Sequence, residues 1–483
     1  MQRLLVLCIS LMLLASWSCT QDGEEITVVA TEEVIFVSGE KIRVVGRLIT
    51  NQALQATDHG FQLSESESFS NPTIISLGEK DGPGRFIGET DGLAISRNYF
   101  VRAFVNVDGV ELFGQTIATE TLSPSIDSFS PLLSGPGEEL TIIGRNFTAD
   151  TRVFFGDVEA TILDMDFESR LTVRIPEFGG KVLTPLIVLS QNERLESTQS
   201  FEYQTGKYTL LAQFPDAERI YDNIYFQDQN SFYFGLGSLK SGASLTSFRR
   251  FDPQTGILSS MDFPGETRKG GFSAGGYIGG GADVAQASFK YKRDFWKLNG
   301  NAFERLADIP TESFHSLAFE ANGQLFYAGG GNDPRAIHKY DPRTNAWSTS
   351  SVSPIEFESN MTTFTYQNKA YFMDSLNLIW EYEPVSDSWS KFTEMPSSVG
   401  TAFGIAQVIG DKVYIGLFSR STVLRELDMK TKTWKTKNPI PGLAASLNAG
   451  AFVYQDQLYL LRTPEKTVPG APMEFYRFEP DGF

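Results

Sequence analysis

The chain contains few side chains that could act as nucleophiles or as soft metal ligands. Its cysteines are Cys8 and Cys19, and its histidines are His59, His315 and His338. A zinc or copper site needs several such ligands together, and only His315 and His338 lie in the C-terminal half of the chain. Without a supporting cluster these two are expected to be surface residues. The sequence therefore predicts no metal site and no cofactor.

The sequence supports a catalytic serine or a phosphate-binding loop no better than it supports a metal site. No Gly-x-Ser-x-Gly turn, which would expose a nucleophilic serine, accompanies a plausible histidine. The glycine runs at 270–281 and 329–331 are not followed by a helix whose N-terminus could hold a phosphate. We interpret these runs as inner strands that crowd together around an axis.

The charge balance excludes a further class of function. The formal net charge is −18 at pH 7, whereas nucleic acids are bound by Lys and Arg side chains that displace counterions from phosphates. We expect no nucleic-acid partner. The acidity is interpreted as a source of solubility at a crowded cell surface.

Cys19 gains a chemical role from the residues around it. Residues 4–14 form an apolar run after Arg3, and small residues follow it. The run is about half as long as a membrane-spanning helix, so residues 1–18 are interpreted as a signal peptide. Cleavage before Cys19 resembles the processing of bacterial lipoproteins, which implies acylation of the thiol and permanent attachment to a membrane. The alternatives are ordinary cleavage that leaves a free thiol, and a retained anchor.

Residues 19–25 continue as a short acidic tether that contains Asp22, Glu24 and Glu25. The tether resembles the signal that sends some lipoproteins to the outer face of the outer membrane in bacteria with two membranes. The resemblance implies that the lipid anchor binds the outer membrane and that the protein faces the cell exterior. An orientation toward the periplasm stays open.

An internal repeat indicates which elements must position the remaining polar residues, because periods of about 40 to 50 residues are typical of propellers and solenoids. Segments 340–347, 382–389 and 427–434 each begin with Tyr or Leu and end seven positions later with Trp, and a proline follows after seven more. Phe303 and Pro310 repeat this frame. Each unit predicts two antiparallel strands joined by a turn, with the Trp on the outer strand packing between neighbouring sheets.

Together these units resemble the kelch motif, which implies a β-propeller over residues 204–483. Residues 208–214 repeat the outer strand without the strands that should precede it, and residues 478–483 stop where such a strand should follow. The two fragments are predicted to pair and close the ring, which removes exposed sheet edges. Counting the repeated prolines predicts six blades. The alternative is an open stack of hairpins.

Residues 26–122 are predicted to form a β-sandwich. Alternating stretches such as 99–107 are typical of half-buried strands. Leu93, six residues before Tyr99, has the spacing of a tyrosine corner, in which the Tyr hydroxyl bonds back to the chain. The segment resembles a fibronectin type III domain.

Residues 123–203 are predicted to form a second sandwich. In segment 140–147, Gly144 and Asn146 allow a tight bend between two strands, and apolar residues alternate around them. This segment and residues 153–156 resemble an IPT/TIG domain, and both sandwiches are expected to act as spacers. The predicted fold class is all-β, with two immunoglobulin-like β-sandwich domains followed by a six-bladed kelch β-propeller closed by its N-terminal outer strand.

Candidate ligand-binding residues are expected at the rim of this ring, where loops between blades, and between the second and third strands of each blade, converge on the axis. Charged and polar side chains collect in these loops. The candidates are Arg219, Glu266, Arg268, Lys269, Glu312, His315, Arg335, Glu358, Ser419, Arg420 and Arg462.

The kelch resemblance leaves the activity open, because propellers host both enzymes and binding platforms. A galactose-oxidase-like copper centre needs a cysteine cross-linked to a tyrosine, and residues 204–483 contain no cysteine. We expect a non-enzymatic surface lipoprotein that binds a glycan, a peptide or an outer-membrane protein such as a transporter, and that resembles accessory lipoproteins of SusCD-like nutrient-uptake systems. The alternatives are a sugar-modifying enzyme resembling sialate mutarotase, acting through Arg268 or Glu312, and a structural subunit of an outer-membrane complex.

Overall fold

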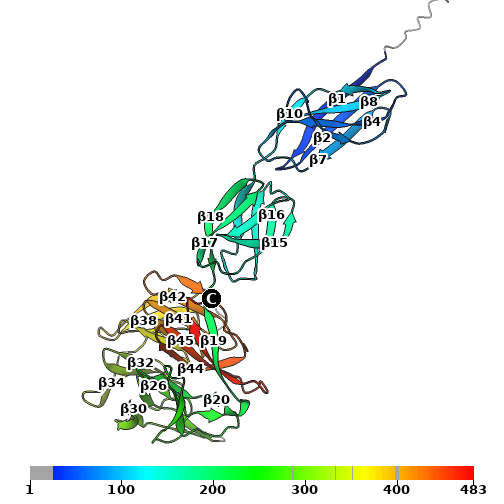
Figure 1. The fold of residues 1–483 in the computed structure, drawn as a ribbon. Coiled ribbons are helices and arrows are strands. Elements are labelled where there is room, and N and C mark those ends of the chain that lie inside the picture. The colour runs from blue at the N-terminus through cyan, green and yellow to red at the C-terminus, as the bar shows by residue number, and fades with distance from the viewer. Residues whose placement is uncertain (1–24, 286–287, 332, 351, 397–401) are drawn as a thin grey trace, which may run out of the picture. The chain divides into compact units, whose positions relative to one another are not determined.

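The computed structural model describes residues 25–285, 288–331, 333–350, 352–396 and 402–483. The expected signal peptide, Cys19 and the tether up to residue 24 lie outside these ranges. The chain divides between Tyr203 and Gln204 into two compact units (Figure 1). Within the described ranges the only helical element is the 3-10 turn η1 (Asp216–Glu218), so the predicted all-β fold class is confirmed. None of these residues forms a helix long and apolar enough to cross a lipid bilayer.

The first unit begins with a sandwich of two antiparallel sheets. Their strand orders are β1-β2-β7 and β10-β8-β4-β5, with β9 paired to β8 and a separate short ladder of β3 and β6. Alternate residues of each strand face the space between the sheets, as Val101, Ala103 and Val105 do in β8. The strands are β1 (Thr27–Val37), β2 (Ile42–Thr50), β3 (Gln55–Ala56), β4 (Asp58–Ser64), β5 (Thr73–Ser76), β6 (Lys80–Asp81), β7 (Gly84–Thr90), β8 (Asn98–Val107), β9 (Val110–Phe113) and β10 (Ile117–Glu120).

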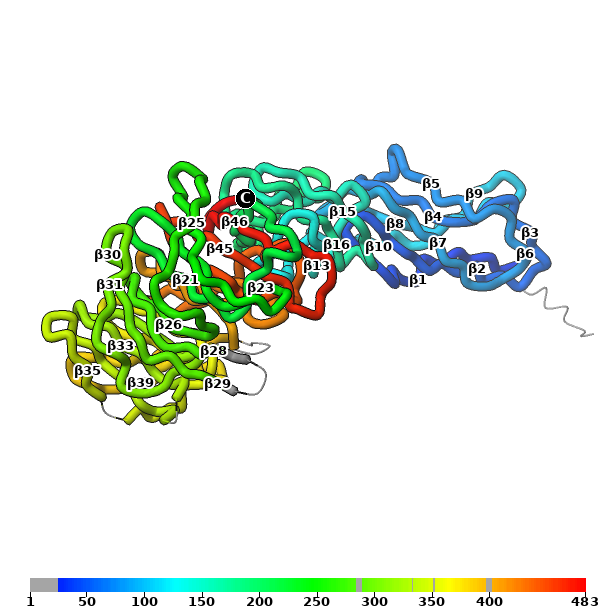
Figure 2. Tube along the Cα trace, turned by 90° about the horizontal axis from the view of Figure 1, so that it is seen from below, coloured from blue at the N-terminus to red at the C-terminus, as the bar shows by residue number. Residues whose placement is uncertain are grey.

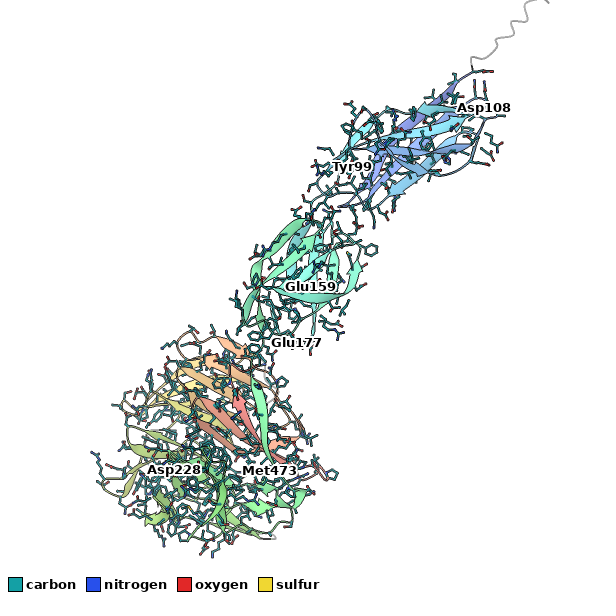
Figure 3. The ribbon with its side chains drawn as sticks, viewed as in Figure 1. Tyr99, Asp108, Glu159, Glu177, Asp228 and Met473 are labelled. Carbon is teal, nitrogen blue, oxygen red and sulfur yellow. The ribbon has the colours of Figure 1, made fainter. Side chains whose placement is uncertain are left out.

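Tyr99 fastens one corner of this sandwich (Figure 3). Its hydroxyl oxygen accepts a hydrogen bond from the backbone N–H of Ala94, with an N–O distance of 3.1 Å. Leu93 is buried in the same core. The contact that the spacing of Leu93 and Tyr99 predicted is therefore present.

The second sandwich is one continuous arrangement of eight strands in the order β11-β13-β16-β15-β14-β17-β18-β12. Asn146 has a φ of +55°, a conformation that Asn tolerates better than most residues, and a Cβ on Gly144 would lie 2.1 Å from the Ser125 carbonyl oxygen. These two residues make the bend that the sequence predicted. The strands are β11 (Ser125–Ser130), β12 (Leu133–Ser134), β13 (Glu139–Arg145), β14 (Arg152–Phe155), β15 (Val158–Asp166), β16 (Arg170–Arg174), β17 (Leu183–Ser190) and β18 (Glu193–Tyr203).

Within the first unit, side chains of each sandwich form hydrogen bonds with the backbone of the other. The side-chain amide of Gln191 donates to the Leu93 carbonyl at 2.7 Å and accepts from the Ile95 N–H at 3.0 Å. The Glu40 carboxylate accepts from the Ala149 N–H at 3.0 Å. Because each bond satisfies a backbone group at the junction, the two sandwiches hold one another in a defined contact.

The second unit is a ring of six four-stranded antiparallel sheets, as predicted. Their inner strands β21, β26, β32, β36, β40 and β44 contact one another in this order, and β44 returns to β21. The ring is therefore closed, and the open stack of hairpins is ruled out.

The first three sheets of the ring follow the chain from inside to outside. They are β21 (Ile224–Gln227), β22 (Phe232–Gly235), β24 (Ser247–Phe251) and β25 (Leu258–Asp262), then β26 (Phe272–Ala274), β27 (Tyr277–Gly279), β30 (Phe295–Asn299) and β31 (Ala302–Leu306), then β32 (Leu317–Ala321), β33 (Gln324–Ala328), β34 (Ile337–Asp341) and β35 (Ala346–Thr349).

The other three sheets have the same arrangement, and two short two-stranded ladders lie outside the six sheets. The sheets are β36 (Thr362–Tyr366), β37 (Lys369–Met373), β38 (Leu378–Glu383) and β39 (Ser388–Glu394), then β40 (Ile405–Ile409), β41 (Lys412–Gly416), β42 (Leu424–Asp428) and β43 (Trp434–Thr436), then β44 (Ser446–Tyr454), β45 (Gln457–Pro464), β46 (Met473–Glu479) and β19 (Lys207–Phe214). The first pair is β20 (Ile220–Tyr221) with β23 (Ser238–Leu239), and the second is the hairpin of β28 (Ala282–Ala285) with β29 (Ser288–Tyr291).

The ring is closed by β19, the first strand of the second unit, which lies beside β46 in Figure 1. Their antiparallel register pairs Lys207 with Glu479 and Phe214 with Met473. The ring of Tyr208 packs on that of Phe478, with centroids 4.5 Å apart. The predicted closure by the N-terminal outer strand is confirmed.

Trp347 on the outer strand β35 packs between neighbouring sheets, as the repeat predicted. Its ring centroid lies 5.0 Å from that of Phe295 on β30 of the preceding sheet. Its indole N–H donates to the carbonyl of Ala307 at 3.0 Å. Trp347 thus joins two successive sheets by both apolar contact and a hydrogen bond.

Candidate functional site

Each inner strand of the ring has one residue at an equivalent position near the axis. Five of these residues lie two positions before the strand begins, and the sixth lies at a β-bulge inside β44. The first five have φ between +51° and +60°, a left-handed conformation that glycine adopts freely and that costs other residues some strain, less for Asn, Asp and His than for most. We call the set the axial ring: Asp222, Gly270, His315, Asn360, Phe403 and Asn448.

Hydrogen bonds link the axial ring into a closed belt. The backbone N–H of each residue from Gly270 to Phe403 donates to the carbonyl of its predecessor, with N–O distances of 2.9, 2.7, 3.5 and 3.0 Å. The Asn448 side-chain amide donates to the Phe403 carbonyl at 2.6 Å. The Asn223 amide donates to the Ala449 carbonyl at 2.7 Å, which joins the last sheet to the first. The belt holds the backbone in its strained conformation.

A cavity of about 310 Å³ lies at the axis, lined by the axial ring and the first residues of the inner strands. Three polar side chains from different sheets come together there. Nε2 of His315 lies 3.5 Å from Oδ1 of Asp222, and the Asn360 amide nitrogen lies 3.4 Å from Nδ1 of His315. The cavity therefore offers a carboxylate, an imidazole and an amide side by side.

Gly270 makes this arrangement possible, because it stands between Asp222 and His315 in the axial ring. A Cβ at Gly270 would lie 2.4 Å from Cδ2 of His315. Only glycine both adopts a φ of +60° without strain and leaves the space through which the imidazole reaches the carboxylate.

The Asp222 carboxylate is held in its charged form. Its hydrogen bond with His315 lowers its pKa, and this outweighs the opposite effect of burial. Electrostatic interaction with His315 and with the ammonium groups of Lys466 and Lys269 lowers the pKa further. At neutral pH the cavity therefore presents a negative hydrogen-bond acceptor.

Asn448 is positioned by Arg462, whose side chain is 3% exposed. The guanidinium donates to Oδ1 of Asn448 at 2.8 Å and to the carbonyls of Leu417 and Ser421 at 3.0 and 3.2 Å. Burial lowers the pKa of Arg462 to about 10, which leaves it charged at neutral pH. Arg462 supports the axial ring from behind and does not line the cavity.

Among the eleven rim residues expected from the sequence, only His315 lines the axial cavity. Arg219 and Arg268, like Arg462, are enclosed. Arg219 donates to the carbonyls of Ala471 and Val468, and Arg268 donates to the Asp294 carboxylate at 2.5 Å and the Gly280 carbonyl at 3.2 Å. These guanidinium groups are occupied in holding loops together.

The other expected residues are dispersed around the rim. Arg335 and Arg420 are exposed and pair with Glu356 at 3.2 Å and Glu465 at 3.0 Å. Glu266 pairs with Lys290 and Lys292 at the end of the β28–β29 hairpin. Glu312 and Glu358 are exposed carboxylates, and Lys269 and Ser419 are half-buried.

Sequence reasoning missed Asp222, Asn360 and Asn448. The available signal was their place in the repeat, because each lies six or seven residues after the proline that ends the preceding outer strand, at Pro215, Pro354 and Pro441. The rim residues were predicted from their charge, whereas the residues that line the cavity share a position in the repeat.

The inner strands enclose a second cavity, of about 420 Å³, at their opposite ends. Glu320 lies there against Gly275, where a Cβ would come 2.0 Å from its carboxylate. Burial raises the pKa of Glu320, while the charge of Lys297 opposes the shift. None of the sequence-predicted rim residues lines this cavity.

The remaining histidines have structural contacts. Nδ1 of His59 lies 2.7 Å from the Gly78 carbonyl oxygen. His338 lies between the hydroxyls of Thr311 and Thr349 at 3.3 and 3.2 Å, and burial lowers its pKa. In the ranges that the structure describes, no three His, Cys, Asp or Glu residues are grouped so as to hold a metal ion.

Part of the chain is similar to two curated animal proteins that share one name. The Kelch repeat and BTB domain-containing protein 8 of Danio rerio is 23% identical over 204 residues, which cover 39% of this chain and 33% of that protein. Its namesake in Xenopus tropicalis is 24% identical over 181 residues, covering 35% and 29%. The chain thus spans about a third of the length of the curated relatives it matches.

Two solved structures are also similar to parts of the chain. The structure of YjhT has 17% sequence identity and a TM-score of 0.44, covering 53% of this chain and 94% of that one. A structural genomics protein of unknown function from Bacteroides thetaiotaomicron has 12% identity and a TM-score of 0.39, covering 74% and 98%.

Residues 124–204 match the family model of the IPT/TIG domain, which confirms the predicted second sandwich. The chain therefore contains an IPT/TIG domain together with a closed ring of six four-stranded sheets that is similar to kelch-repeat proteins.

Proposed function

We propose that this protein is a binding protein of a bacterial outer membrane, held there by acylated Cys19 and presenting its ring to a ligand. The proposal is supported by the apolar run before Cys19 and by the acidic tether after it. In it, the two sandwiches act as spacers. The fibronectin type III resemblance of the first sandwich belongs to this proposal, with support from the Tyr99 contact at its corner.

The observation that carries the binding role is the convergence of Asp222, His315 and Asn360 on the axial cavity. Three sheets contribute one polar side chain each, on backbone held in a strained conformation by the belt. Strain of this kind is retained where surrounding structure enforces it, and it concentrates at functional sites. We therefore place the ligand site at the axial ring.

The chemistry of the cavity favours a ligand rich in hydroxyl or amide groups. A carboxylate accepts hydrogen bonds, an amide both donates and accepts, and an imidazole does either. A cavity of about 310 Å³ accommodates one end of a larger ligand such as a glycan. The alternatives to a glycan are the end of a peptide and an outer-membrane transporter. Binding of any of the three would suit an accessory protein of a SusCD-like uptake system.

An array of immobilised glycans and peptides, probed with the purified full-length chain, tests this proposal. We expect saturable binding that falls at least tenfold in Asp222→Asn and His315→Gln. Val385→Ser is the matched control, since Val385 is 79% exposed in the outer turn between β38 and β39. Circular dichroism verifies that each variant is folded. Binding that survives both cavity variants would place the working surface elsewhere.

A second candidate function is a sugar-modifying activity of the sialate mutarotase kind. It is favoured by the pairing of His315 with Asp222, because an imidazole beside a carboxylate can accept and return a proton. Nuclear magnetic resonance of anomer exchange should then show acceleration that disappears in His315→Gln. Exchange at the uncatalysed rate with every sugar tested would dismiss this candidate.

A further inference from the structure

The β28–β29 hairpin is inserted between β27 and β30 of the second sheet and lies outside the four-stranded pattern (Figure 2). Two aromatic side chains of β29 are partly exposed to solvent, with Phe289 51% and Tyr291 39% exposed. Their rings are close to parallel, with an interplanar angle of 27° and centroids 5.9 Å apart. Together they form an exposed apolar surface, which we call the aromatic platform.

The aromatic platform is connected to the axial cavity by direct ring contacts. Phe289 meets Phe314 edge to face at a centroid distance of 5.4 Å. Phe314 in turn stacks on His315 at 4.1 Å, with an interplanar angle of 29°. The ring of Phe314 therefore lies between the platform and the imidazole that faces Asp222.

The base of the hairpin is anchored beside the axial ring. The N–H and carbonyl of Lys269 both pair with Ala282, at 2.9 and 3.0 Å. The Lys292 side chain is 5% exposed and its ammonium pairs with Glu266. These contacts fix the hairpin next to Gly270, so the platform is held near the cavity.

The geometry points to a saccharide subsite, and we propose that the aromatic platform binds the apolar face of a pyranose ring whose hydroxyls reach the axial cavity. This inference rests on the proposed function of the axial ring and specifies its ligand. One pyranose combines an apolar face of C–H groups with polar edges, which matches an apolar platform beside a carboxylate, an imidazole and an amide.

Lysines and carboxylates at the hairpin are paired with one another. Lys292 pairs with Glu266 and lies 4.0 Å from Asp283, and Lys290 lies 3.9 Å from Glu266. A neutral ring needs no counter-charge from these pairs. We therefore assign the platform to an uncharged pyranose.

Binding of neutral pyranose oligosaccharides on the glycan array, followed by saturation-transfer NMR, tests the inference with the purified full-length chain. We expect Phe289→Ala and Tyr291→Ala to weaken binding about tenfold and to reduce saturation of the protons on one ring face. Phe167→Ala in the second sandwich is the matched control, because Phe167 is 90% exposed and outside the ring. Sorbitol, which has hydroxyls without a ring face, should not compete.

The possible outcomes separate this inference from the proposed function. Loss of binding in the platform variants and retention in Phe167→Ala would support the subsite. Unchanged binding in both platform variants, with loss in His315→Gln, would overturn the subsite and leave the axial site standing. Peptide binding without saccharide binding would also overturn the subsite. If the chain bound neither saccharides nor peptides, both the subsite and the proposed function would be overturned.

Discussion

The imidazole of His315 reaches the carboxylate of Asp222 across Gly270, with 3.5 Å between Nε2 and Oδ1. The two residues belong to sheets that are not neighbours, and the sheet between them contributes a glycine at the equivalent position. The contact between His315 and Asp222 therefore depends on the lack of a side chain at Gly270. Position in the ring, more than charge in the sequence, decides which residues meet.

Gly270→Ala should destabilise the ring through both backbone strain and a clash with His315. Gly300→Ala is the matched control, since Gly300 has the same φ of +60° but open space around its Cβ position. We expect a loss of about 1 kcal/mol for Gly300→Ala and at least twice that for Gly270→Ala. Urea unfolding followed by tryptophan fluorescence measures this, because five of the six tryptophans lie in residues 204–483. Equal losses would contradict the proposed clash.

Tyr208 on the closing strand carries a buried hydroxyl with no hydrogen-bond partner among the described residues. Tyr208→Phe should therefore raise the free energy of unfolding by about 1 kcal/mol, whereas Tyr208→Ala should lower it by about 3 kcal/mol because the packing on Phe478 is lost. Tyr221→Phe is the control, since its hydroxyl donates to the Pro464 carbonyl at 2.8 Å. That variant should lose about 1 kcal/mol. Destabilisation by Tyr208→Phe in the same urea titration would refute the argument.

Glu426 forms a buried ion cluster near the closing strand. It is 4% exposed and pairs with Lys437 at 2.8 Å and Lys412 at 2.9 Å. Burial alone would raise its pKa, but the two lysines lower it overall. Glu426→Gln removes the carboxylate partner of Lys412 and leaves the buried ammonium of Lys437 to the exposed carboxylate of Asp481, 3.5 Å away, so it should cost about 3 kcal/mol at pH 7. Glu356→Gln, at a 62% exposed carboxylate, should change stability little.

The pH dependence of the same cluster has a defined sign. Because the folded pKa of Glu426 is below the unfolded value of about 4.3, its stabilisation is complete above that value and is lost as pH falls through the folded pKa. The difference in unfolding free energy between the native chain and Glu426→Gln should therefore shrink in acid. A difference that stays constant from pH 7 to pH 3 would contradict the ion-pair account.

Glu40, at the junction of the two sandwiches, should behave in the opposite way. Burial raises the pKa of Glu40 in the folded protein, although the hydrogen bond from the Ala149 N–H opposes the shift. Folding therefore disfavours the charged form, and stability falls as the pH rises through the unfolded and then the folded pKa. Glu40→Gln keeps an acceptor for Ala149 and should slow hydrogen exchange of that amide at pH 7, with no effect near pH 3. Exposed Glu196 on β18 supplies the control, Glu196→Gln. Faster exchange in Glu40→Gln at pH 7 would overturn the prediction.

Local patterns were enough to predict the strands, the six sheets and the closing strand. Residues 208–214 matched an outer strand because Tyr208 and Pro215 occupy the positions of the repeat, and β19 pairs with β46 accordingly. The same holds for Asn146 and Tyr99, whose turn and corner contacts depend on neighbours close in the sequence.

The rim residues were harder to place, because a charge in a loop can point inward or outward. Arg219 and Arg462 were expected at the rim, yet both are buried against backbone carbonyls of other loops. Those carbonyls lie far away in the sequence and need a donor once water is excluded. Only the folded chain shows which loops come together.

By itself, the amino-acid sequence determined the all-β class, the repeat and the way the ring closes, since these depend on side-chain alternation and on periodic Trp and Pro residues. The tertiary structure alone decided that Asp222, His315 and Asn360 share one cavity and that Phe289 contacts the Phe314 ring beside His315. Closing the ring brings equivalent positions of distant repeats to one axis. Which of them meet then depends on the side chains, or their absence, in the sheets between.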